Sequence, residues 1–239
     1  MALRDAGWRI VNLACGLGRP AQHQRRRSEV EEACRRAGFE LLPVDPPLAL
    51  SAGDDLAAAE ETLVTLLGGL LAELGPAIVC APSPHDGHHA HELVGRAARR
   101  ALSAHAGPTP PLWLWGIWAD LPFPTMIAPF DAKRLDEVKH ALAAHASEQL
   151  RLPLDRLIEA RAVLHAAVGE ERVHGSGLAG DRALEYAELI CEVVLQPDGW
   201  RLGASRRFDA EAPLASPSAR PIGWWLEAES VHDRLRRER

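Results

Sequence analysis

Four short apolar runs, separated by segments with helical periodicity, constrain the fold of this chain more than any other feature. They cover residues 8–15, 39–44, 76–82 and 111–120. Short runs that are apolar throughout are typical of strands buried on both faces, as in parallel sheets. The alternation of strand and helix therefore predicts an α/β fold, a Rossmann-like and mostly parallel sheet with helices on both faces.

The segments between and after these strands carry the helical pattern. Apolar residues recur at helical spacing from Ser28 to Ala37, and Gly38 favours the end of a helix there. Asp54 or Asp55 is placed to cap the next helix. The expected helices are residues 28–37, the capped segment up to about residue 74, and residues 89–105, 135–150 and 152–169.

Length and charge bound the class of protein. A chain of 239 residues is long enough to bury one sizeable core. We expect residues 1–196 to form this domain, and residues 197–239, rich in proline, glycine and charge, to be its C-terminal extension. The formal net charge of -6 argues against a dedicated nucleic-acid binder.

Cysteine usage and hydropathy indicate the compartment. Four cysteines without a C-x-x-C pair are too few for a disulfide framework in a chain of this length. Cys15 and Cys80 lie in apolar runs, and both are expected to be small buried residues. The N-terminus does not resemble a signal peptide, and no uncharged apolar stretch approaches the roughly 18 residues of a membrane span. We therefore expect a cytoplasmic protein without a membrane span.

A cluster of histidines follows the third apolar run directly. Four of the chain's 11 histidines lie between His85 and His91, and ligands of α/β sheets bind beyond the carboxyl ends of the strands. His88 and His91 are three residues apart at the expected start of a helix, so both can face one cavity. Gly87 permits a sharp turn. The cluster predicts a metal or acid–base site, and a polar loop with incidental histidines is the alternative.

The letters around this cluster, "HDGHHAHELVGRA", resemble a motif of a known family. The motif D-G-H-P-D-H-x-x-x-G-R-A is the second motif of the PIG-L/LmbE-like zinc-dependent N-deacetylases. The matching positions are Asp86, Gly87, His88, His91, Gly95, Arg96 and Ala97. Two further segments, "VNLACGLGRP" at 11–20 and "KHALAAHASEQ" at 139–149, resemble the family's second strand with its following loop and a late helix. The matched segments together cover most of residues 8–190.

The resemblance implies a hydrolase of amide C–N bonds that removes an acetyl group from an N-acetylglucosamine-type substrate with the help of zinc. His91 matches the family's histidine ligand of the metal. His88 matches the histidine that polarises or protonates the tetrahedral intermediate. Ala90 stands where the family has the aspartate that orients this histidine, and Asp86 is the candidate to replace it as a catalytic carboxylate if the loop bends back.

Three residues are candidates for substrate binding. Trp118 and Asp120 lie at the carboxyl end of the fourth apolar run, where they can stack on or hydrogen-bond a sugar ring. His145 matches the late helix of the family. The implied partner is a small N-acetylated amino sugar, not a nucleic acid.

The family's first motif, A-H-P-D-D-E, has no counterpart in the chain. It supplies a histidine ligand, an aspartate ligand and the general-base aspartate, before the segment that resembles residues 8–15. We therefore expect the first strand to be missing, which leaves an apolar edge that favours self-association. Either the natural start lies further upstream, or the chain is a degenerate homologue. As given, it is expected to bind zinc poorly and to hydrolyse little.

Two other functions stay open on the sequence. One is a non-catalytic homologue that binds a glycan or a protein partner through the former active-site cleft. The other is a metal hydrolase of a different kind that uses His85, His88 and His91, because hydrolytic zinc sites take three protein ligands.

Overall fold

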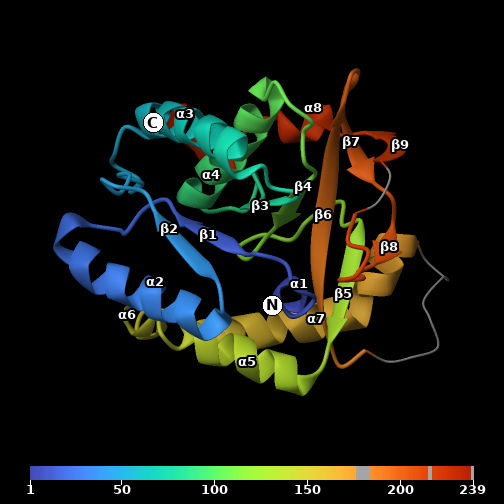
Figure 1. The fold of residues 1–239 in the computed structure, drawn as a ribbon, viewed down its shortest axis with the longest axis horizontal. Helices are drawn as coiled ribbons and strands as arrows, with labels where there is room; N and C mark the ends of the chain where they lie inside the picture. The colour runs from blue at the N-terminus through green and yellow to red at the C-terminus, as the bar shows by residue number, and fades with distance from the viewer. Residues whose placement is uncertain (176–183, 215–216, 238–239) are drawn as a thin grey trace. The chain divides into compact units, whose positions relative to one another are not determined.

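The computed structural model describes residues 1–175, 184–214 and 217–237. The chain divides into two compact units, drawn together in Figure 1. The first unit comprises Met1–Ala49, Ile127–Glu188 and Arg207–Pro213, and the second comprises Leu50–Met126, Leu189–Arg206 and Leu214–Arg239. The division expected at residue 197 stays a prediction.

The first unit contains the predicted strand–helix–strand segment at its start. β1 (Val11–Ala14) and β2 (Glu40–Pro43) pair in parallel, and α2 (His23–Ala37) connects them. A 3₁₀ turn, η1 (Pro20–Gln22), leads into α2, so this helix begins before the expected residue 28. Gly38 ends α2 with φ +71°, a left-handed conformation that glycine adopts without a steric cost.

The remaining helices of the first unit are α1 (Ala2–Asp5), α5 (Ala132–Leu142), α6 (Ala146–Gln149) and α7 (Leu154–His174). In this unit α5 packs on α2, and α7 packs on α5 and α6 (Figure 1). The prediction of one continuous helix over 135–150 is wrong. The helical backbone breaks at His145, whose ψ of 55° lies outside the helical range, and α6 starts after it.

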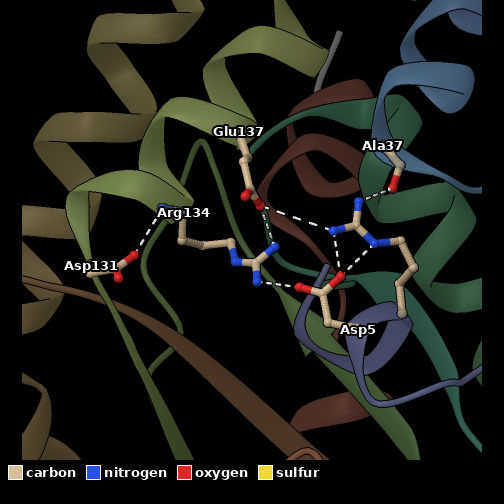
Figure 2. Close-up of polar contacts among 6 residues, drawn as sticks. Asp5, Ala37, Asp131, Arg134 and Glu137 are labelled. Atoms are coloured by element: carbon tan, nitrogen blue, oxygen red, sulfur yellow. Dashed lines mark hydrogen bonds and ion pairs between the residues drawn. The ribbon is translucent and has the colours of Figure 1, made fainter.

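An ion network fastens the short N-terminal helix to its neighbours in the first unit (Figure 2). Asp5 pairs with Arg134, whose Nη1 donates to Glu137 Oε2 at 2.6 Å. Arg4 donates to Asp5 and, at 2.6 Å, to the Ala37 carbonyl at the end of α2. The hydrogen bonds from the two arginines lower the pKa of Asp5.

The second unit is built on parallel and antiparallel strands. β3 (Val79–Pro82) and β4 (Leu112–Trp115) are parallel, and β4 pairs antiparallel with β6 (Tyr186–Gln196), whose first three residues belong to the first unit. β7 (Gly199–Gly203) and β9 (Pro217–Pro221) continue the antiparallel pairing. β5 (Met126–Phe130) and β8 (Arg206–Arg207) are also strands with residues in both units.

Four helices of the described residues belong to the second unit. They are α3 (Leu56–Leu74), α4 (His89–Ala104), α8 (Gly223–Leu226) and α9 (Val231–Arg237), and α3 lies beside α4 (Figure 1). Asp55 caps α3 as predicted, since its Oδ1 accepts from the Ala58 amide at 3.0 Å. The predicted α/β class, parallel strands flanked by helices, is confirmed. The antiparallel strands after residue 185 were not expected from the sequence.

The core of the second unit fixes where the histidine cluster lies. Apolar side chains of α4, β3, β4, β6, β7 and α8 form one buried cluster. Gly95 lets α4 approach the end of β3, because a Cβ atom on it would lie 2.4 Å from the Pro82 carbonyl oxygen. α4 and the end of β3 therefore pack closely together. The histidine cluster lies in the segment of chain that connects them and in the first turn of α4.

Two remaining expectations concern exposure. Cys80 is exposed, so the expectation that it is buried is wrong; among the described residues β3 stands at the end of the strand order, with a paired strand on one side only. Cys15 is partly buried, and burial raises the pKa of its thiol to about 11. None of the helices in the described residues is long and apolar enough to cross a membrane.

Candidate functional site

Asp86, in the loop after β3, is held rigidly by the backbone and orients a neighbouring histidine. Its side chain is fully buried, with 0% of its surface exposed. Oδ1 accepts from the backbone amides of Ile117 at 2.6 Å and Trp118 at 3.1 Å, just beyond β4. Oδ2 lies 2.6 Å from Nδ1 of His91. Asp86 therefore holds the His91 ring in one orientation, as carboxylates beside functional histidines generally do.

Two glycines allow this arrangement. Gly87 has φ +78°, so the chain turns sharply between Asp86 and His88. A Cβ atom on Gly116 would lie 3.1 Å from Asp86 Oδ1 and 2.5 Å from the Ala119 carbonyl oxygen. The tight turn after β4 thus brings its amides to the carboxylate, and a side chain at residue 116 would block it.

Glu92, in the first turn of α4, stabilises the sharp turn at Gly87. It is 2% exposed, and its Oε1 accepts from the Gly87 amide at 3.0 Å. This bond reaches back over the first turn of α4 to the residue before the helix, and His88 occupies the N-cap position without a capping hydrogen bond from its side chain. The position of His88 is therefore set by the backbone on both sides of it.

His88 is a neutral histidine with an unused ring nitrogen. Its ring stacks on His89 and on Trp118, with centroids 4.6 and 5.7 Å apart, and is tilted against His91 at 4.9 Å. Burial, and next the charges of His91 and His89, lower the pKa of His88 to about 4. Its Nδ1 is buried and has no hydrogen-bond partner within the described residues. A neutral imidazole nitrogen in this position can accept or donate one hydrogen bond.

The other two histidines of the cluster contact the backbone. His85 Nε2 lies 2.7 Å from the Trp225 carbonyl oxygen, and His89 Nε2 lies 2.9 Å from the Leu50 carbonyl oxygen. Both rings thus serve the local structure, and the arrangement does not favour the metal site of His85, His88 and His91.

The described residues do not fit a hydrolytic zinc site. No group of three or more His, Cys, Asp or Glu side chains within them is placed to hold a metal ion, and such sites need three protein ligands. Within the described histidine cluster, His91 is oriented by Asp86 in the way that a ligand histidine commonly is. Its assignment as a zinc ligand stays a prediction.

The candidate substrate-binding residues lie in different places. Trp118 is 41% exposed, and its ring covers His88. Asp120 is exposed two residues further on. His145 belongs to the first unit, where it precedes α6, and burial lowers its pKa. The structure thus brings Asp86, His88, His91 and Trp118 together in the second unit, whereas His145 belongs to the first unit.

Three residues of this region were not predicted from the sequence. Glu92 and Gly116 hold the loop and the turn, and the capping-box pattern does not indicate Glu92, because it pairs the N-cap residue with the third helical residue, here His91. His232 lies on α9, and its Nε2 is 2.6 Å from the Gly87 carbonyl oxygen. No local pattern in the sequence indicates that contact, because the two residues are separated by 145 positions.

Comparison with known proteins gives the fold class. No family model and no curated protein matches the chain. The solved structures that resemble it share the fold of the LmbE/PIG-L proteins. The zinc-inhibited form of teicoplanin deacetylase Orf2 is 15% identical, has a TM-score of 0.59, and the match covers 83% of this chain and 92% of that chain. The A40926 pseudoaglycone deacetylase Dbv21 is 17% identical, with a TM-score of 0.57 and coverages of 85% and 88%.

A third solved structure has a different activity. It is GalB, the 4-carboxy-2-hydroxymuconate hydratase from Pseudomonas putida KT2440, which is 17% identical with a TM-score of 0.58 and coverages of 82% and 88%. At these identities the likeness shows the fold alone. Since deacetylases and a hydratase share this fold, the activity of the present chain must be argued from its own site.

Proposed function

We propose that this chain is a deacetylase-type protein whose histidine cluster binds an N-acetylated amino sugar. The observation that supports this most is the neutral His88 beneath the half-exposed Trp118, with an unused Nδ1. The resemblance of the motif around His88 supports this substrate class, and the deacetylases among the structural neighbours support the deacetylase type.

Each residue has a role in this proposal that its geometry permits. Trp118 offers an aromatic face for the apolar side of a sugar ring. His88 makes one hydrogen bond with the N-acetyl group, since its ring is neutral and can act as donor or acceptor. The Asp86–His91 pair is a rigid neighbour of His88, because Asp86 is held by backbone amides and does not move with the ligand.

Replacing His88 by alanine is expected to weaken binding of N-acetylglucosamine about tenfold, the effect of losing one well-placed hydrogen bond. Titration calorimetry of the intact chain measures this. His140→Ala is the matched control, because His140 is an exposed histidine on α5 of the first unit and is expected to leave binding unchanged. Equal affinities of the parent chain and the His88→Ala variant would contradict the proposed role of His88.

The zinc content of the chain is a separate expected result. Since the described residues bring no three metal-binding side chains together, we expect the dialysed chain to retain much less than one zinc per molecule. Slow or undetectable release of acetate from N-acetylglucosamine should accompany this. Elemental analysis and an acetate assay measure the two quantities.

A second candidate function is zinc-dependent hydrolysis of the N-acetyl group. The contact between Asp86 and His91 favours it, because a carboxylate commonly orients a zinc-binding histidine in this way. Stoichiometric zinc in the purified chain, together with acetate release that His91→Ala abolishes, would establish this candidate in place of simple binding.

A further inference from the structure

The last helix of the chain contacts the histidine cluster through polar groups. His232 on α9 lies with Nε2 at 2.6 Å from the carbonyl oxygen of Gly87, the residue before His88. The His232 ring stands edge-on to the His89 ring, with centroids 6.3 Å apart, and His89 is stacked on His88. All these residues belong to the second unit. The start of α9 is therefore part of the surroundings of the site.

A second polar contact of α9 lies one residue further along. Asp233 Oδ2 is 2.9 Å from Arg96 Nη1 on α4, and the two side chains are 36% and 20% exposed. Arg96 also pairs with Glu60 of α3, so this arginine keeps an ionic partner when α9 moves away. Breaking the contact therefore leaves no unpaired arginine behind.

The apolar residues of α9 do not fasten it to the core. Val231 is 70% exposed and Leu235 is 48% exposed. Helices held to a domain usually bury such side chains in an apolar stripe. Ser230, in contrast, is 1% exposed, and its hydroxyl donates to Asp233 Oδ2 at 3.0 Å. The segment is thus anchored by the buried Ser230. The helix that follows contacts the histidine cluster through polar, partly exposed groups.

We propose that α9 is a lid of the histidine site, hinged near Ser230 and closed by the contacts of His232 with Gly87 and of Asp233 with Arg96. Partly exposed polar contacts are weak and exchange with water, so the lid opens far more readily than the core unfolds. In the open state, His88 becomes accessible to a ligand beside Trp118, which is already partly exposed in the closed state. This inference rests on the proposed function for the identity of the ligand, but access to His88 does not depend on that identity.

The test measures access to His88 in the absence of any sugar. The full-length chain is treated with diethyl pyrocarbonate, and modification of individual histidines is followed by tandem mass spectrometry. The double variant His232→Ala/Asp233→Asn is expected to raise the modification rate of His88 about threefold, since the contact of His232 is lost and the contact with Arg96 loses its ionic character. The exposed His140 of the first unit serves as internal reference and should keep its rate.

A matched variant separates opening of the lid from a general effect on α9. Leu235→Ala changes an exposed side chain of the same helix and keeps both contacts, so His88 should react as in the parent chain. The single variants His232→Ala and Asp233→Asn should each show part of the increase. An unchanged rate at His88 in the double variant, with α9 still helical, would overturn the lid.

Binding of N-acetylglucosamine then distinguishes the two proposals. If the sugar binds, the double variant should bind it with a faster association rate in stopped-flow measurements. If the modification rate of His88 rises in the double variant but neither the parent chain nor the variant binds the sugar, the lid is supported and the proposed function is wrong. If the sugar binds but neither the association rate nor the modification rate changes, the proposed function stands and the lid is wrong.

Discussion

Replacing Asp86 by alanine is expected to destabilise the chain by about 3–5 kcal/mol, because it removes a buried carboxylate from all its partners at once. The amides of Ile117 and Trp118 lose the acceptor that they share, at 2.6 and 3.1 Å. The ring of His91 loses the oxygen 2.6 Å from its Nδ1. Urea unfolding measures the loss of stability, and binding of N-acetylglucosamine should weaken along with it.

The variant Asp86→Asn is the matched control for this result. An asparagine keeps the shape of the side chain, and its Oδ1 still accepts from the amides of Ile117 and Trp118. Only the contact with His91 must change, since an amide NH₂ group would then face the His91 Nδ1. We expect the loss of stability to be well under half of that in Asp86→Ala. Equal losses in the two variants would contradict the role given to the backbone amides.

Replacing Glu192 by alanine is expected to have an effect of similar size, about 3–5 kcal/mol, for a reason unrelated to the site. Glu192 lies on β6 with 0% exposure. It accepts from Arg206 at 2.7 and 3.0 Å and from Trp113 Nε1 at 2.9 Å. Its loss removes two charge-assisted hydrogen bonds from the guanidinium of Arg206, whose side chain is only 17% exposed. Thermal and chemical unfolding measure the effect.

An exposed pair in the same unit provides the comparison for Glu192. Asp198 and Arg201 form an ion pair at the turn between β6 and β7, and the side chain of Asp198 is 61% exposed. Surface pairs of this kind contribute little, so Asp198→Ala should leave the stability almost unchanged. A small effect of Glu192→Ala, comparable with that of Asp198→Ala, would show that the buried cluster is not a major source of stability.

The early strands and helices of the chain were predictable because their hydropathy is uniform. The runs 39–44, 76–82 and 111–120 each contain an observed strand, although the strands are shorter than the runs. β6 was missed for a physical reason. It carries Glu192 in its middle, and a sequence pattern cannot distinguish a buried carboxylate paired with a distant arginine from an exposed one. Its partner strands β7 and β9 lie in a region rich in proline, glycine and charge, where hydropathy gives no signal.

The candidate site was predictable in its residues but not in their contacts. The spacing of His88 and His91 indicated that both lie at the start of one helix, which the structure bears out. Asp86 was expected to assist His88, whereas its carboxylate contacts His91. This choice depends on the amides beyond β4, about thirty residues later in the chain, and on Gly116, which allows the turn that presents them. Such partners are defined only once the strands are assembled.

Binding of an N-acetylated amino sugar at the histidine cluster is the property on which the proposed function depends. Its most direct test is titration of the ¹⁵N-labelled chain with N-acetylglucosamine, followed by two-dimensional amide NMR. We predict saturable shifts at residues 87–91, where His88 precedes the first turn of α4, and at residues 116–119, where the amides of Ile117 and Trp118 hold Asp86. The lack of any shift in these two segments at saturating sugar, or shifts confined to other parts of the chain, would contradict the claim.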